Sequence, residues 1–221
     1  TDSASTGGFD PARGGETPWQ ERRGHNYLLG LDRERPHAVT DSASAATSLT
    51  SGIKTYNVAI NVSADGTQVI PIARRLQDDE NFKVGIVSSV PVSHATPAAG
   101  YANNVTRKDY QDLARDLLGL PSAAHRDEPL PGVDVLIGGG WGMEVKEDAQ
   151  QGANYLPGNP YLHQDDIDRA DAKHGGRYVV AQRTAGKSGR KSLMQAASQA
   201  ADRDQRLLGF FGTQFEGHLP F

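Results

Sequence analysis

Cysteine is absent from the 221-residue chain, which excludes disulfide bonds, zinc–thiolate sites and a cysteine nucleophile. Long apolar runs are absent as well. No stretch approaches the roughly 18 residues that a membrane helix needs, so we expect no membrane span. Basic charge is not in excess either, because 23 Lys and Arg stand against 27 Asp and Glu. The net charge of −4 disfavours nucleic acid as a partner.

The N-terminus also lacks the basic-then-apolar layout of a secretion signal, which favours a soluble chain that is either cytosolic or already processed.

What is present is enough apolar sequence, 37% of residues, for a buried core. Short apolar runs alternate with segments whose apolar residues recur every three or four positions. The runs predict buried strands at 57–62, 83–88, 133–137, 177–180 and 207–211. The periodic segments predict helices at 68–77, starting near Ile70, and at 108–118 and 191–202. Such alternation predicts an α/β fold with a largely parallel sheet.

The sequence TDSAS occurs twice, at Thr1–Ser5 and at Thr40–Ser44. The second copy begins a run of small residues that ends at Gly52, which predicts a tightly packed helix capped by Asp41. Ser42 then lies in the first helical turn, where backbone N–H groups and the helix dipole favour an anion. On the local sequence, a structural capping role for both residues stays open. The first copy lies in a Gly-rich loop sequence, and we interpret it as a coincidence.

Two longer segments resemble the alkaline phosphatase family. VTDSASAATSLTSGIKTYNVAINV, from Val39, resembles the family's nucleophile segment, V-T-D-S-A-x-S/A-A-T followed by T/S-G-x-K-T-x-N. VGIVSSVPVSHATPAAGYANNVTRKDY resembles its next signature, in which a phosphate-binding Arg follows a Thr by eleven residues; Thr96 and Arg107 keep that separation. VDVLIGGGWGMEV and the stretch after 205 are similar to later segments. The resemblance runs from about Pro36 to the C-terminus and implies a three-layer α/β/α sandwich.

The resemblance implies hydrolysis of a phosphate monoester through a phosphoserine intermediate at a metal site. Ser42 would be the nucleophile and a zinc ligand, Arg107 would hold two phosphate oxygens, and Asp41 would orient Arg107 through a charge-assisted hydrogen bond. Two zinc ions and one magnesium ion are implied, with Thr96 as a ligand of the magnesium-type site. His94, two residues before Thr96, either borders or ligates that third metal or is a hydrogen-bonded structural histidine. Taken singly, Arg107 also fits a solvated helix start and Thr96 a turn before Pro97.

The chain departs from the family pattern at the metal ligands. The family's G-D-G-M-G, Asp-x-x-x-His and Asp-His segments are all missing. We therefore expect an incomplete chain, with a loop-rich segment at 1–35 and a partial alkaline-phosphatase-like domain at 36–221, lacking the N- and C-terminal metal-ligand segments. The expected partners are a phosphate monoester, inorganic phosphate and the remaining segments of the same phosphatase. The resemblance also implies a homodimer when complete and a periplasmic or extracellular location.

Two other segments carry less information. GGGWG, which follows the run at 133–137, is a poor dinucleotide loop because no helix in the required register follows it. HQDDIDRADAKH, at 163–174, predicts a solvated helix face rather than a metal site, because Asp165, Asp166 and Asp168 do not share one face. From a different functional class, the alternative is a non-catalytic fragment that keeps the fold and an anion-binding niche without metals. A related phosphodiesterase or sulfatase-type enzyme is a third hypothesis.

Overall fold

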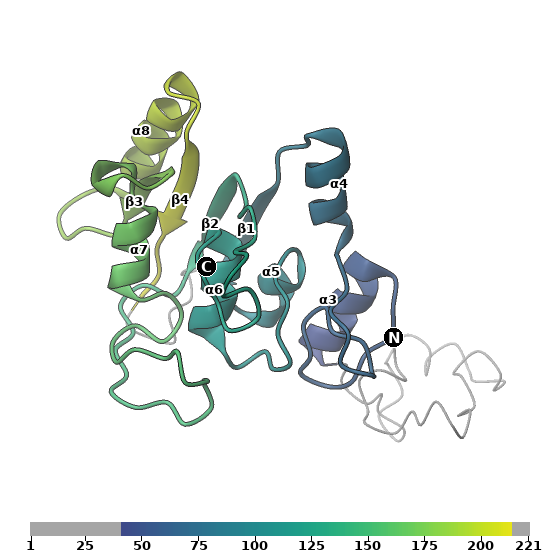
Figure 1. Cartoon of the computed structure of the whole chain (residues 1–221). Helices are drawn as coiled ribbons and strands as arrows, with labels where there is room; N and C mark the ends of the chain where they lie inside the picture. Colours follow the sequence, from purple (N-terminus) through teal and green to yellow (C-terminus); the bar gives the residue numbers. More distant parts are fainter. Residues whose placement is uncertain (1–40, 214–221) are drawn as a thin grey trace, which may run out of the picture.

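The computed structural model describes residues 41–213, so the predicted segment 1–35 and the first TDSAS lie outside the described residues. The helices of the described part are α3 (Ser42–Ser51), α4 (Ile72–Glu80), α5 (Ala95–Ala99), α6 (Tyr110–Leu118), α7 (Gln164–Ala170), the short 3-10 helix η1 (Ala172–His174) and α8 (Gly189–Asp202) (Figure 1). The strands are β1 (Gly85–Pro91), β2 (Val135–Gly139), β3 (Tyr178–Gln182) and β4 (Arg206–Phe210).

These strands form one sheet in which every neighbouring pair is parallel, with the spatial order β1-β2-β4-β3. The chain therefore passes from β2 to the edge strand β3 and returns through α8 to insert β4 between them. The prediction of a largely parallel α/β sheet is confirmed. Each strand contains most of one of the four later apolar runs.

The prediction of a strand at 57–62 is wrong. Within this segment only isolated bridges form, from Ile60 to Asn104 and from Val62 to Gln68. Val58 and Asn61 have positive φ angles, 71° and 47°, which interrupt an extended backbone. The segment is a buried loop because side chains satisfy its amides: the N–H of Asn61 donates to the Thr47 hydroxyl at 2.9 Å.

The predicted helices are present, with shifted starts. α4 begins after Pro71, which occupies the N-cap position, where the missing N–H of proline has no consequence. α8 begins two residues earlier than predicted, because the Ser188 hydroxyl accepts a hydrogen bond from the Lys191 amide. α3 ends as predicted, with Gly52 in the left-handed conformation at φ 72°.

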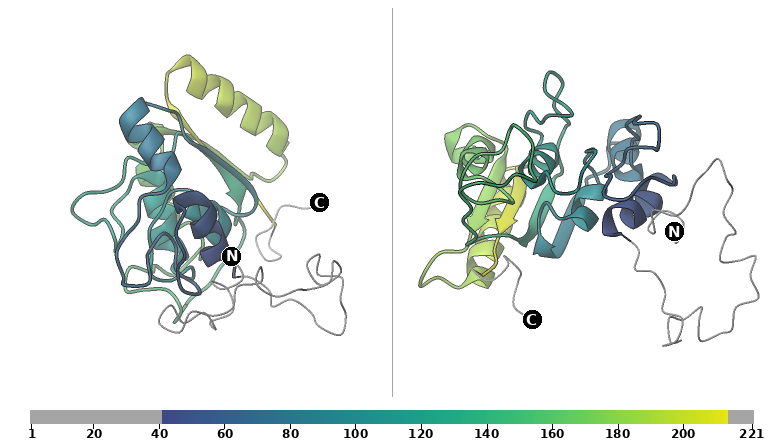
Figure 2. Two further views of the ribbon diagram at one scale, coloured as in Figure 1. Left: turned by 90° about the vertical axis from the view of Figure 1, so that its right-hand side faces the viewer. Right: turned by 90° about the horizontal axis from the view of Figure 1, so that it is seen from below.

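Buried side chains lie on both faces of the sheet. On one face Leu136 and Leu208 pack with Ile167 and other residues of α6 and α7. On the other face Val179 and Leu207 pack against Ala196 and neighbouring residues of α8, which covers that side alone in the left view of Figure 2. The described part is a three-layer α/β/α arrangement, as predicted. None of its helices combines the length and apolar character needed to cross a bilayer.

A separate cluster packs α3 against α5 beyond the edge strand β1. It consists almost entirely of small side chains: Ala43, Ala46, Ala95, Ala98, Ala99 and Ala102, with Ile60 and Leu113. Alanines let two helices approach closely, and the Thr50 hydroxyl crosses the interface to donate to the Ala99 carbonyl at 2.9 Å. This packing holds the small-residue helix that begins at Ser42 directly beside the segment that carries Thr96.

Candidate active site

Asp41 is the N-cap of α3 and the centre of the site. One carboxylate oxygen, Oδ2, accepts from the amides of Ser44 at 3.0 Å and Val58 at 2.9 Å. The other, Oδ1, accepts from Nη1 of Arg107 at 2.9 Å. Burial alone would raise the pKa of Asp41, but the two amides and the Arg107 guanidinium outweigh it and hold that pKa below its ordinary value. The carboxylate is therefore charged at neutral pH.

Ser42, the first residue of α3, is exposed. Its side chain makes no hydrogen bond to any other residue of the described part. It lies where the first amides of a helix have no intrahelical partner and the helix dipole is positive. A hydroxyl in this position can meet an anion that approaches the helix end.

Arg107 lies 66 residues from Asp41 in sequence, and the loop at Val58 joins the two. The Val58 amide donates to Asp41, and the Val58 carbonyl accepts from the Arg107 amide at 2.6 Å. Val58 makes both bonds in a left-handed conformation, φ 71°, which is strained for a β-branched residue. The Arg107 side chain is 24% exposed, and Nη1 is its only nitrogen bonded to Asp41. The guanidinium therefore keeps N–H groups for a second acceptor.

Thr96 and His94 lie at the start of α5. Thr96 is exposed, and His94 is the N-cap residue, without a side-chain capping bond. The His94 ring stacks on Tyr110, with centroids 5.4 Å apart, and meets the edge of Tyr161 at 5.2 Å. The structure thus joins Asp41 to Arg107 by a direct ion pair, with Ser42 next to Asp41 in the chain, and places His94 and Thr96 at the start of the helix that packs against α3.

The residues described do not make a zinc site. No group of three or more His, Asp or Glu side chains that could hold a metal occurs among residues 41–213. Zinc is held by three or four protein ligands, whereas this region offers two hydroxyls, of Ser42 and Thr96, and the imidazole of His94. A metal centre here needs ligands from residues that the structure does not describe.

The acidic helix α7 contradicts part of the prediction of a solvated helix face at 163–174. Asp165 and Asp168 are exposed, as expected of a solvated face, but Asp166 is only 1% exposed. Its Oδ2 accepts from Nε of Arg115 at 2.9 Å, while its Oδ1 is buried without a hydrogen-bond partner in the described part. Burial raises the pKa of Asp166, and Arg115 offsets only part of that rise. The Asp166 carboxylate points inward because it forms an ion pair there with the buried Arg115.

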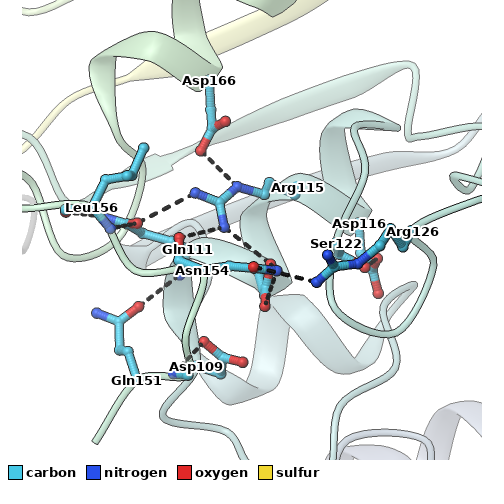
Figure 3. A network of polar contacts seen from close by, with 12 residues as sticks. Asp109, Gln111, Arg115, Asp116, Ser122, Arg126, Gln151, Asn154, Leu156 and Asp166 are labelled. Atoms are coloured by element: carbon cyan, nitrogen blue, oxygen red, sulfur yellow. Dashed lines mark hydrogen bonds and ion pairs between the residues drawn. The ribbon is translucent and has the colours of Figure 1, made fainter. Parts of the chain in front are cut away.

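The inward carboxylate belongs to a buried polar network on α6 that sequence reasoning missed (Figure 3). Nη1 of Arg115 also donates to Asp112 Oδ1 and to the carbonyl of Asn154, both at 3.0 Å. Gln111 Nε2 donates to the carbonyls of Leu156 and Asn159. The only signal in the sequence was the density of charge on a helix flanked by loops rich in Asn and Gln.

The same network reaches the N-cap of α6. Asp109, two residues after Arg107, accepts from the Gly152 amide at 3.1 Å and from Asn104 Nδ2 at 3.2 Å. Burial, followed by the neighbouring Asp112, raises the pKa of Asp109. The loop 148–159 is therefore tied along the whole of α6, and the start of that helix fixes the backbone just after Arg107.

Comparison with known proteins identifies relatives of this arrangement. The chain is 36% identical to alkaline phosphatase 4 of Bacillus subtilis over 120 residues, 51% of this chain and 24% of that protein. It is 29% identical to the streptomycin-6-phosphate phosphatase of Streptomyces griseus over 185 residues, 83% of this chain and 38% of that protein. The chain thus spans well under half the length of these curated relatives.

Comparison with solved structures and with a family model also identifies alkaline phosphatases. The fold matches Thermus thermophilus alkaline phosphatase with a TM-score of 0.53 and 26% identity, covering 83% of this chain and 30% of that one. It matches a cold-active alkaline phosphatase from Shewanella sp. with a TM-score of 0.51 and 26% identity, covering 82% and 34%. The model of the alkaline phosphatase family matches residues 20–220, and the chain therefore belongs to that family.

Proposed function

We propose that this chain carries the nucleophile and the phosphate clamp of a phosphomonoesterase. The observation that carries the proposal is the Asp41–Arg107 bond beside the exposed Ser42 at the start of α3. In this proposal the substrate is a phosphate monoester and inorganic phosphate is a product that also binds. The same family membership suggests a homodimer and a periplasmic or extracellular location.

The phosphate group binds between Arg107 and the first turn of α3. The N–H groups of Arg107 that Asp41 leaves uncommitted hold two non-bridging oxygens, and the amides at the helix start face the phosphate charge. Asp41 fixes the guanidinium plane. A planar fork held in place lowers the entropy lost when the reacting groups are aligned.

Ser42 Oγ attacks phosphorus in line with the ester oxygen. The new O–P bond forms as the bond to the leaving alkoxide breaks, and the proton lost by the Ser42 hydroxyl passes through solvent to that alkoxide. The phosphoserine is then attacked by water from the same side as the departed alcohol, which releases inorganic phosphate and restores the serine hydroxyl. Arg107 holds the phosphate oxygens through both steps, so it stabilises the charge of both transition states.

Metals belong to the proposal as cofactors: two zinc ions and one magnesium ion. Ser42 is the proposed zinc ligand, and Thr96 and His94 are proposed ligands of the magnesium-type site. Zinc would supply Lewis-acid activation of a hydroxyl nucleophile. The described residues do not complete a zinc site, so the remaining zinc ligands would come from residues that the structure does not describe.

A second candidate function rests on the absence of a complete zinc site among the described residues. A non-catalytic fragment could retain the anion-binding niche at Asp41, Ser42 and Arg107 without any metal. The two functions differ in zinc content and in turnover, but both require phosphate to bind at Arg107.

Phosphate binding at Arg107 is the test of the niche. Titration of the chain with inorganic phosphate by calorimetry should show an affinity that falls about ten- to a hundredfold in Arg107→Ala, because one charge-assisted contact is lost. Arg107→Lys should fall between, since it keeps the charge but loses the fork. Arg75, exposed on α4, is the matched control, and Arg75→Ala should bind as the parent does. Equal affinity in the parent and Arg107→Ala would place Arg107 outside the site.

A further inference from the structure

A cavity of about 500 Å³ opens at the carboxyl edge of the sheet, beside the start of α8. Its walls come from Ile137 of β2, the loop 183–187 after β3, the first turn of α8, and Phe211 and Gly212 after β4. The volume is in the range of small-molecule sites, about 300–1,000 Å³. α8 and α3 lie toward opposite ends of the described fold in Figure 1 and in the right view of Figure 2. The cavity is therefore separate from the site at Ser42.

The position of the cavity follows from the strand order. The connection after β2 leads to α7 on one face of the sheet, and the connection after β3 leads to α8 on the other face. Where successive connections leave for opposite faces of an open parallel sheet, a crevice forms at the carboxyl ends of the strands, and ligands bind there. β4, inserted between β2 and β3, ends at Phe210, and the next residue, Phe211, lines this crevice.

Among residues 41–213, three cationic side chains line the cavity, Arg183, Lys187 and Arg190, and no carboxylate does. Arg183 is held in place because it stacks on Trp141, 5.4 Å from the ring centroid, and donates to the Gly212 carbonyl. The Lys187 and Arg190 side chains form no ion pair or hydrogen bond with any residue in 41–213. In a chain of net charge −4, three cations around one cavity that no described carboxylate lines create a local attraction for anions.

The wall between these cations is apolar. Ile137, Leu193 and Phe211 belong to the packing between the sheet and α8 and turn their remaining surface to the cavity. Gly189 packs against the Phe211 ring, since a Cβ atom there would lie 3.3 Å from it, and both residues line the cavity. We propose that this cavity binds an organic anion with an apolar body, such as an aryl phosphate, sulfonate or carboxylate. The apolar body packs against Ile137, Leu193 and Phe211, and Lys187 and Arg190 hold the anionic group.

Naphthalene-2-sulfonate is the probe. Its sulfonate group contains no phosphate ester bond, so a phosphatase cannot hydrolyse it. Calorimetric titration of the 221-residue chain should give saturable one-to-one binding that weakens with salt. The double variant Lys187→Gln/Arg190→Gln should bind about tenfold or more weakly, because two charge-assisted contacts are lost. The matched control is Lys191→Gln. Lys191 is a cation of α8, next to Arg190, that does not line the cavity, so this variant should bind the probe as the parent does.

A second variant keeps every charge. Leu193→Trp places a larger side chain in the cavity and should abolish binding, while circular dichroism confirms that the helices remain. Arg107→Ala should leave binding of the probe unchanged, which separates this cavity from the phosphate niche. Absence of binding in the parent chain would overturn the proposal. Undiminished binding in both the double variant and Leu193→Trp would also overturn it, because the probe would then bind elsewhere.

Discussion

Val58 joins the two halves of the phosphate niche through its backbone rather than its side chain. Its N–H donates to Asp41 and its carbonyl accepts from the Arg107 amide, so the backbone of a single residue sets the distance between the helix cap and the arginine loop. A β-branched residue at φ 71° is strained by about 1–3 kcal/mol. The surrounding hydrogen bonds hold it in this conformation, which makes the loop a rigid support for Arg107.

Two substitutions at Val58 separate its backbone role from its side chain. Val58→Pro removes the N–H that Asp41 accepts and forces φ to about −65°, so it should lower the free energy of unfolding by about 3 kcal/mol or more and weaken phosphate binding. Val58→Gly keeps the N–H and tolerates the left-handed conformation, so stability should stay within about 1 kcal/mol of the parent. Urea denaturation and phosphate calorimetry measure both effects. Equal stability and equal phosphate affinity in the two variants would mean that the backbone of Val58 does not hold the niche.

At the level of residues, the sequence predicted the Asp41–Arg107 contact but not what supports it. The contact followed from a resemblance that spans two segments. Nothing in the apolar run around Val58 indicates a positive φ, since a β-branched residue between Asn57 and Ala59 favours an extended strand. The loop conformation arises because buried partners in α3 and the Asn104 segment take up its amides, and those partners are distant in sequence.

At the level of elements, α6 behaves as a core helix although four of its nine residues are charged or amidic. Every residue from Gln111 to Leu118 is buried. The loop 148–159 and helix α7 cover its polar side and satisfy Gln111, Asp112 and Arg115 through long-range bonds. The spacing of apolar residues predicted a helix at 108–118. It did not indicate what covers the polar side, because periodicity cannot show that a distant loop will supply the partners.

The Asp166–Arg115 ion pair gives a direct test of this network. Asp166→Ala leaves the buried Arg115 with Asp112 as its one remaining carboxylate, and the loss of one partner of a buried pair costs about 3–5 kcal/mol. We expect the lower end of that range, because Asp112 stays. The control is Asp168→Ala on the same helix, an exposed position where the change should stay within about 0.5 kcal/mol. Urea denaturation of both variants measures the difference, and equal stability losses would show that the network does not hold α7 to α6.

For the whole molecule, alternation of strands and helices was enough to predict the layered fold. The strand order was not predictable in the same way. It depends on the return of the chain through α8 to place β4 inside the sheet, and a sequence pattern does not record which strands a crossover will make neighbours. The edge strand β1 exposes Val87 to 72%, a high value for an apolar residue in a sheet.

The central claim is that Ser42 is the nucleophile, and covalent trapping tests it most directly. Protein purified from the cells that make it, with its metals in place, is mixed with a ³²P-labelled phosphate monoester and quenched in acid, and the labelled peptide is sequenced. We predict phosphoserine at Ser42, no label in Ser42→Ala, and undiminished label in Ser3→Ala, the serine of the duplicate TDSAS. Removal of metal with a chelator should abolish labelling, and zinc with magnesium should restore it. Label on any other residue, or undiminished label in Ser42→Ala, would contradict the account.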